Sequence, residues 1–147
     1  MKPGTFLDQL DDARVIAAIQ TAESTTSGEI RVFVSGRKLR GDDIIARAAR
    51  RFEKLGMTAT RERNGVLLFF MPRERKFAVI GDTAIHEKCG TPFWEDIAAG
   101  LRERLARGDF TEAVIEAVGR AGKVLAAHFP RTADDHNELP DEIGRED

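Results

Sequence analysis

The sequence predicts a three-layer α/β/α sandwich with a small mixed sheet of three to four strands. Two short apolar runs, at 66–71 and 77–80, are joined by a charged turn that contains Pro72, which is typical of a buried β-hairpin. An earlier alternating segment, 30–35, is separated from the hairpin by a helical pattern, so the first two strands should be parallel. Strands this apolar need cover on both faces, and the helical segments can supply it.

In the first half of the chain the sequence predicts one helix before the first strand and one helix after it. Apolar residues at helical spacing indicate a helix over 6–24. In the segment 30–35 side chains alternate with the period of a strand that has two different faces. A second helix begins at Asp42 or Asp43 and ends before Gly56, which is a common residue just after a helix.

The second half of the chain is predicted to be mainly helical. A short helical turn over 83–88 follows the hairpin. The Thr91-Pro92 pair then opens a longer helix, because Pro at the first helical position after a Thr cap is a strong start signal. This helix stops at Gly108, and a last helix ends before Pro130.

Residues 1–130 are therefore expected to form one domain, followed by an acidic tail over 131–147. A formal charge of -2 provides no global field that would favour nucleic acid or an acidic membrane. The chain has one cysteine, no signal-peptide pattern, and no apolar run near the roughly 20 residues that cross a bilayer. We expect a cytoplasmic protein that has no membrane span and does not bind nucleic acid.

Four polar residues are predicted to meet at one edge of the sheet. Parallel strands begin at the same edge, and the hairpin returns its second strand to that edge. Glu29, Arg63, Asn64 and Asp82 should therefore share a single rim. Open α/β sheets usually bind ligands at the opposite, carboxyl edge, but the polar residues favour this rim as the candidate site.

The sequence leaves two interpretations open for the rim residues. Arg63 either binds an anion with its guanidinium fork or simply pairs with Glu62. Asn64 and Gly65 could form a turn that accepts positive φ. Asp82 either caps the helix that follows it or supplies oxygen atoms to a hard cation such as Ca²⁺ or Mg²⁺.

Familiar enzyme signatures are missing from the sequence. Cys89 lacks the Arg six residues later that a cysteine phosphatase needs, and there is no P-loop and no GxGxxG loop. No serine lies in a GxSxG elbow, and His86-Glu87 is not followed by the second His of a zinc helix. A hydrolase built on this chain would have to use a metal-activated water.

Six separated segments of the chain form an ordered pattern: GEIRV at 28–32, F with LGM at 52–57, RNGVL at 63–67, AVIGD at 78–82, IHEKCG with FW at 85–94, and HFP with NELPDE at 128–142. In this order they resemble the TPM-domain family, which includes thylakoid lumen acid-phosphatase-like and photosystem II repair-like proteins. The chain is similar to the short stand-alone bacterial form. The resemblance implies an α/β/α fold, with weak acid phosphatase activity or calcium binding in some members.

The resemblance also implies a role for the acidic tail, which by composition alone would be a solvated segment. The NELPDE motif suggests that the tail docks, and Asp134, Asp135 and Glu138 could then join Asp82 in binding Ca²⁺ or Mg²⁺. We expect a binding or regulatory module whose ligand is a protein partner or a cation. Its binding of a protein partner could also depend on the cation. The alternative is a weak metal-assisted acid phosphatase, so the sequence leaves open whether the chain is an enzyme.

Overall fold

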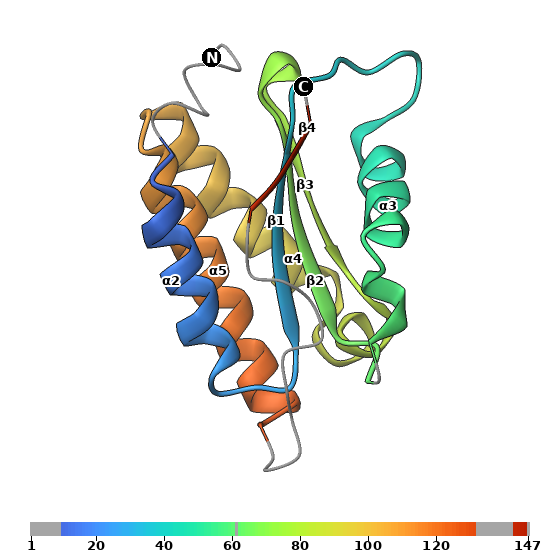
Figure 1. The fold of residues 1–147 in the computed structure, drawn as a ribbon, viewed down its shortest axis with the longest axis vertical. Coiled ribbons are helices and arrows are strands. Elements are labelled where there is room, and N and C mark those ends of the chain that lie inside the picture. The colour runs from blue at the N-terminus through green and yellow to red at the C-terminus, as the bar shows by residue number, and fades with distance from the viewer. Residues whose placement is uncertain (1–9, 61, 132–142, 147) are drawn as a thin grey trace.

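A four-stranded mixed sheet lies between helices on both of its faces (Figure 1). The computed structural model describes residues 10–60, 62–131 and 143–146. Three helices cover one face of the sheet and α3 covers the other, which confirms the three-layer α/β/α prediction. The helices are α2 (Asp12–Glu23), α3 (Ile44–Lys54), α4 (Thr83–Ala106) and α5 (Phe110–His128), with short 3₁₀ turns η1 (Met57–Ala59) and η2 (Pro72–Glu74). Among the described residues no helix combines the length and the apolar character that crossing a bilayer requires.

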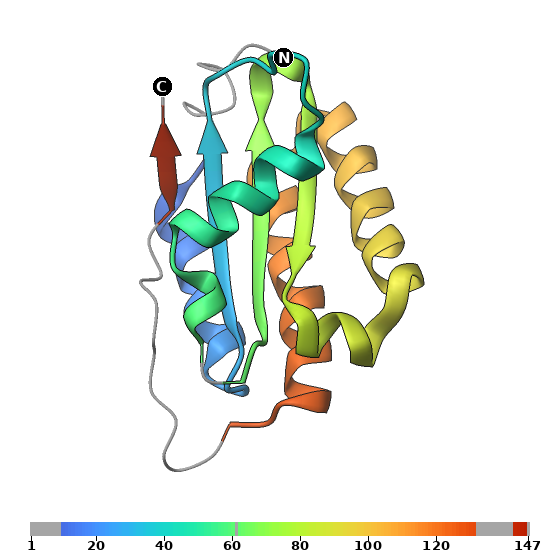
Figure 2. The same cartoon turned by 90° about the vertical axis from the view of Figure 1, so that its right-hand side faces the viewer.

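The sheet has the strand order β3-β2-β1-β4 (Figure 2). The strands are β1 (Glu29–Ser35), β2 (Gly65–Met71), β3 (Lys76–Gly81) and β4 (Gly144–Glu146). As predicted, β1 and β2 are parallel, with Glu29 opposite Gly65. β2 and β3 form the antiparallel hairpin, with Val66 opposite Gly81.

The fourth strand comes from the segment that was expected to be an acidic tail. β4 runs parallel to the end of β1, with Gly144 opposite Phe33 and Glu146 opposite Ser35. A Cβ atom at Gly144 would lie 2.4 Å from Cδ2 of Phe33, so only glycine permits this pairing. The predicted docking segment 137–141 lies outside the described residues, as do Asp134, Asp135 and Glu138.

The core consists of two apolar clusters, one on each face of the sheet. Val32 belongs to the cluster beneath α2, α4 and α5, whereas Phe33 and Phe69 belong to the cluster beneath α3. Val32 and Phe69 are fully buried. Val79 and Trp94 are only half-buried, because β3 forms an edge of the sheet.

Two helix boundaries differ from the prediction or refine it. A continuous helix from residue 6 is wrong, because Asp11 has an extended backbone and its carboxylate accepts a hydrogen bond from the Arg14 N–H at 3.2 Å. Asp11 therefore caps a helix that begins at Asp12. The predicted break before Pro92 is present as a kink inside α4, where Gly90 is non-helical with φ 72° and ψ 175°.

Candidate functional site

Two members of the predicted rim, Arg63 and Asp82, form an ion pair. Nε of Arg63 lies 2.8 Å from Oδ2 of Asp82, and Nη2 lies 2.9 Å from Oδ1. Oδ1 also accepts the N–H of Thr83 at 2.7 Å, so Asp82 is the N-cap of α4. The hydrogen bond to Asp82 raises the pKa of Arg63 above its ordinary value. The Asp82 carboxylate is thus committed to the start of a helix.

The backbone of Arg63 takes part in the same junction. Arg63 has φ 54°, so the positive φ that was expected at Asn64 or Gly65 falls on the preceding residue instead. This conformation lets the Arg63 carbonyl accept the N–H of Ala84 at 3.1 Å, while the Gly65 carbonyl accepts the N–H of Asp82 at 2.9 Å. The start of β2 is therefore held against the start of α4 by main-chain bonds, and the ion pair adds to them.

The other two rim residues lie at the same edge of the sheet but are buried. Asn64 is 1% exposed, and its amide nitrogen donates to Oγ of Ser27 at 3.1 Å. Glu29 is 2% exposed and lies opposite Gly65 at the start of β1. The structure therefore brings all four residues to one edge, with Arg63 as the exposed member.

The carboxylate of Asp82, a predicted ligand of Ca²⁺ or Mg²⁺, is engaged by its described neighbours. Both carboxylate oxygens of Asp82 already accept hydrogen bonds, from Arg63 and Thr83. Nδ1 of His86 accepts the indole N–H of Trp94 at 3.0 Å. Within 10–60, 62–131 and 143–146, no group of three or more His, Cys, Asp or Glu side chains could hold a metal ion. The rim is better explained as a structural clamp.

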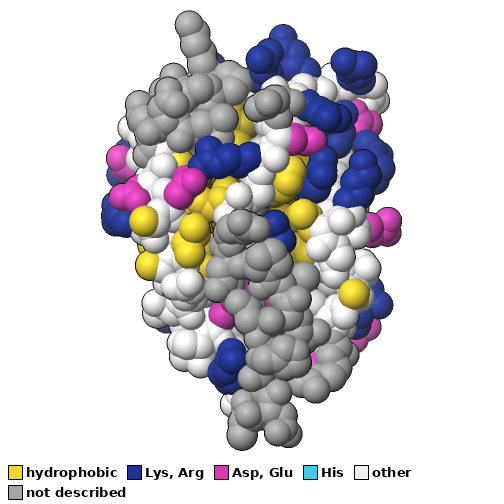
Figure 3. Space-filling model, viewed as in Figure 1, with side chains coloured by type: hydrophobic (Ala, Val, Ile, Leu, Met, Phe, Trp, Pro, Cys, Tyr) yellow, Lys and Arg dark blue, Asp and Glu magenta, His cyan; other side chains and the backbone are white. Residues whose placement is uncertain are grey.

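A hollow of about 890 Å³ with a basic lining lies at the opposite edge of the sheet, beyond the carboxyl ends of β1 and β4. In the space-filling view Lys and Arg side chains gather over α3 and the loop before it (Figure 3). We call this feature the basic hollow; its cationic residues are Arg37, Lys38, Arg40, Arg47, Arg50, Arg51, Lys54 and Arg73. Gly36, Leu39 and Glu146 also line it. The sequence analysis did not identify the residues of the basic hollow as a candidate site. They lie at the carboxyl edge of the sheet, where open α/β sheets usually bind ligands.

The local sequence explains how these cations converge. Arg47, Arg50, Arg51 and Lys54 follow one another at i, i+3, i+4 and i+7 in α3, which places them along one side of the helix. The remaining cations come from the loop that follows β1 and from the hairpin turn. The helical spacing of these arginines could have predicted a basic side of the helix. A net charge of -2 for the whole chain gives no indication of such a local cluster.

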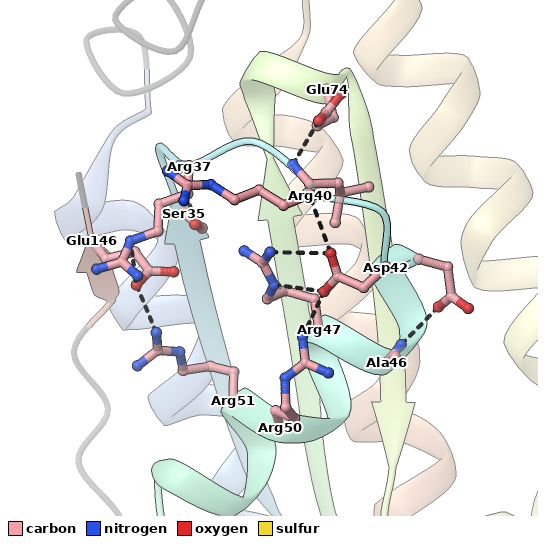
Figure 4. A network of polar contacts seen from close by, with 12 residues as sticks. Ser35, Arg37, Arg40, Asp42, Ala46, Arg47, Arg50, Arg51, Glu74 and Glu146 are labelled. Atoms are coloured by element: carbon pink, nitrogen blue, oxygen red, sulfur yellow. Dashed lines mark hydrogen bonds and ion pairs between the residues drawn. The ribbon is translucent and has the colours of Figure 1, made fainter.

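Asp42 holds two of these arginines in place (Figure 4). Its carboxylate accepts from Nε and Nη2 of Arg47 at 3.0 and 3.2 Å, and from Nη2 of Arg50 at 2.5 Å. The hydrogen bond from Arg47, followed by the backbone N–H of Arg40, holds the pKa of Asp42 far below its ordinary value. Asp42 therefore remains ionised and fixes the direction of both guanidinium groups.

Glu146 of β4 holds a second pair of arginines. Its Oε1 lies 2.6 Å from Nη2 of Arg51 and 3.4 Å from Nε of Arg37. The Arg51 guanidinium also lies 4.5 Å above the ring of Phe33, a cation–π contact. The last described strand thus brings a carboxylate into the basic hollow (Figure 4).

The hollow retains a large excess of positive charge. Asp42 and Glu146 oppose four of the eight cations. Within the part of the chain that the structure describes, no carboxylate lies within ion-pair distance of the other four, which are Lys38, Arg40, Lys54 and Arg73. Such a concave cluster attracts anions and offers guanidinium forks to oxyanions.

Comparisons with known proteins agree on one family. The family model described as TPM domain matches residues 2–124. The chain is also similar to BA42, a protein of the psychrophilic bacterium Bizionia argentinensis whose structure was solved by NMR, with 31% sequence identity and a TM-score of 0.83. That match covers 94% of this chain and 96% of BA42. The sequence has no match among curated proteins.

Proposed function

The chain belongs to the TPM-domain family, and on that premise we propose that it is a binding module whose ligand is an anion held in the basic hollow. One observation carries the proposal: eight cationic side chains line one concave site, and among its described lining residues Glu146 supplies the one carboxylate. So many like charges in one place repel one another, and this repulsion destabilises the compact state. A bound anion would remove that repulsion.

The arrangement of the arginines supports binding. Arg47 and Arg51 have side chains that are 20% and 22% exposed, and each is held by a carboxylate. Their guanidinium groups are therefore positioned before a ligand arrives, which lowers the entropy lost on binding. Arg37 and Arg50 share these carboxylates and are more exposed, at 64% and 56%, so their guanidinium groups are accessible to a ligand from solvent.

The same geometry favours binding over hydrolysis. A hydrolase needs a nucleophile, a general base or a metal-activated water. The described lining of the hollow contributes guanidinium and ammonium groups and the carboxylate of Glu146, which is paired with Arg51 and Arg37; among these lining residues there is no thiol, hydroxyl or imidazole side chain. At the rim, Asp82 is engaged by Arg63 and Thr83.

The test compares retention on immobilised heparin, a generic polyanion, over a salt gradient at neutral pH. One variant carries Lys38→Gln and Arg40→Gln, which change two exposed side chains of the hollow. The matched control carries Lys88→Gln and Lys123→Gln, which lower the net charge equally on exposed parts of α4 and α5. Wild type and control should elute together, at a higher salt concentration than the hollow variant.

Coincident elution of all three proteins would contradict the proposal. The same samples are assayed for release of phosphate from a phosphomonoester, with and without Ca²⁺ or Mg²⁺. Cation-dependent release that Asp82→Asn abolishes, in a variant that remains folded, would replace the binding module with a metal-assisted acid phosphatase.

A further inference from the structure

We infer that the ligand of the basic hollow is a compact oligophosphate without a nucleobase, of the pyrophosphate and tripolyphosphate class. This inference rests on the proposed function and names its ligand. The volume of about 890 Å³ falls within the range of small-molecule sites, roughly 300–1,000 Å³. The hollow therefore suits a small ligand with several charges.

Four arginines of the hollow form two pairs, each held by its own carboxylate. Asp42 positions Arg47 and Arg50, whereas Glu146 positions Arg37 and Arg51. Arg47 and Arg51 lie one helical turn apart on α3, with roughly 5–6 Å between their Cβ atoms. A chain of linked phosphoryl groups can contact both groups of arginines at once, whereas a single phosphate would contact one.

Glu146 shows how an oxyanion is held in the hollow. Its carboxylate, which is 13% exposed, lies between Arg51 and Arg37 at 2.6 and 3.4 Å. A phosphoryl group has the same preference for the guanidinium fork and carries more charge. The ligand and Glu146 therefore compete for the same donors. Glu146→Gln removes the competing charge but keeps an amide oxygen that can accept from Arg51 and hold it in place, so this replacement should strengthen ligand binding.

The lining argues against a nucleobase. Proteins that hold bases in a basic groove usually stack them on aromatic side chains. Among the described lining residues the apolar contribution comes from Leu39, and no aromatic side chain takes part. The nearby Phe33 is 4% exposed, and its ring is covered by Arg51 and stacks with Phe69 at 5.9 Å between centroids. The hollow thus recognises charge and offers no platform for a base.

The experiment measures dissociation constants by isothermal titration calorimetry at constant ionic strength. The probes are inorganic phosphate, pyrophosphate, tripolyphosphate and adenosine triphosphate. We expect affinity to rise about tenfold with each added phosphoryl group, and adenosine triphosphate to bind no more tightly than tripolyphosphate. The Lys38→Gln/Arg40→Gln variant should bind tripolyphosphate about tenfold more weakly, and Glu146→Gln several-fold more tightly.

Three further probes identify the competing classes of ligand: a single-stranded oligonucleotide, poly-glutamate, and vesicles that contain phosphatidylserine. Tighter binding of any of these than of tripolyphosphate would overturn the inference. Equal affinity for phosphate and tripolyphosphate would also overturn it. In either case the difference in heparin retention between the hollow variant and its control would persist, so the proposed function would stand. Loss of that difference would instead overturn the proposed function.

Discussion

Replacement of Asp82 tests whether the rim is a structural clamp or a cation site. Asp82→Ala removes the acceptor of the Thr83 N–H and both acceptors of Arg63. Asp82→Asn keeps an oxygen that can cap α4, since Asn and Asp are similar N-caps, but it loses the charge that faces Arg63. The two variants therefore separate the cap from the ion pair.

The size of the expected effect follows from these contacts. Loss of an N-cap costs about 1 kcal/mol, with a range of roughly 0.5–2 kcal/mol. Asp82→Ala should therefore be less stable than Asp82→Asn by about 1 kcal/mol, or about 2–4 °C in Tm for a domain of about this size. Both variants should be less stable than wild type, because each removes the negative charge that faces Arg63. The side chain of Asp82 is only 4% exposed, so solvent screens this ion pair poorly on the Asp82 side.

The assay is thermal and urea unfolding followed by far-ultraviolet circular dichroism. Asp96→Ala, at an exposed position of α4, is the control and should unfold almost as wild type does. Equal stability of Asp82→Ala and wild type would refute the clamp. An increase in Tm on addition of Ca²⁺ or Mg²⁺ that Asp82→Asn abolishes would identify Asp82 as a cation ligand instead.

Three other predictions concern the sheet and the basic hollow. Gly144→Val should displace β4, because the Cβ of the new side chain would clash with Phe33. The Gly36 N–H, which donates to the Glu146 carbonyl at 2.7 Å, should then lose its protection from hydrogen exchange. Full protection of the Gly36 N–H in this variant would contradict the role of Gly144. The lowered pKa of Asp42 means that its ion pairs stabilise the fold above the ordinary Asp pKa of about 3.9, and that this contribution is lost as the pH falls below that value. The urea midpoint of Asp42→Asn should thus lie below that of wild type at neutral pH and approach it in acid; a gap that widens in acid would be inconsistent with this sign. Phe69→Ala should cost about 3–5 kcal/mol in urea unfolding, and a loss below about 1 kcal/mol would mean that the core is not packed as described.

The central sheet could be predicted because its pairings follow from local patterns. The hairpin is encoded by two adjacent apolar runs and a charged turn, and the parallel pairing of β1 and β2 follows from the intervening helix. The position of the rim follows from the same topology, since it depends only on which strand ends meet.

β4 could not be predicted, because nothing in its own three residues indicates a strand. Its pairing depends on the absence of a side chain at Gly144 opposite Phe33, and on the ion pair that Glu146 makes with Arg51. These partners are distant in sequence, so the local pattern is merely polar and acidic. The helix boundary at Asp11 was missed because apolar spacing continues before it, whereas the cap geometry there decides the start.

The roles at the two edges of the sheet needed tertiary information. A polar rim on adjacent strand ends is compatible with a site or with a clamp, and only the bonds of Asp82 and the positive φ of Arg63 favour the clamp. The basic hollow is formed by a loop, a helix and a hairpin turn that are separated in the sequence. Their convergence cannot be seen in a total charge of -2.

The eight cations of the basic hollow lie together at one edge of the sheet, although the isoelectric point of the sequence is about 6.0. At neutral pH the protein carries a small net negative charge, yet it should still adhere to a cation exchanger through its basic end. The field of an anionic partner would rotate the protein so that its basic end faces the partner before contact. This steering increases the rate of association. The effect fades at about 0.1 M salt, where the Debye length of about 10 Å is short compared with the distances over which the two partners approach.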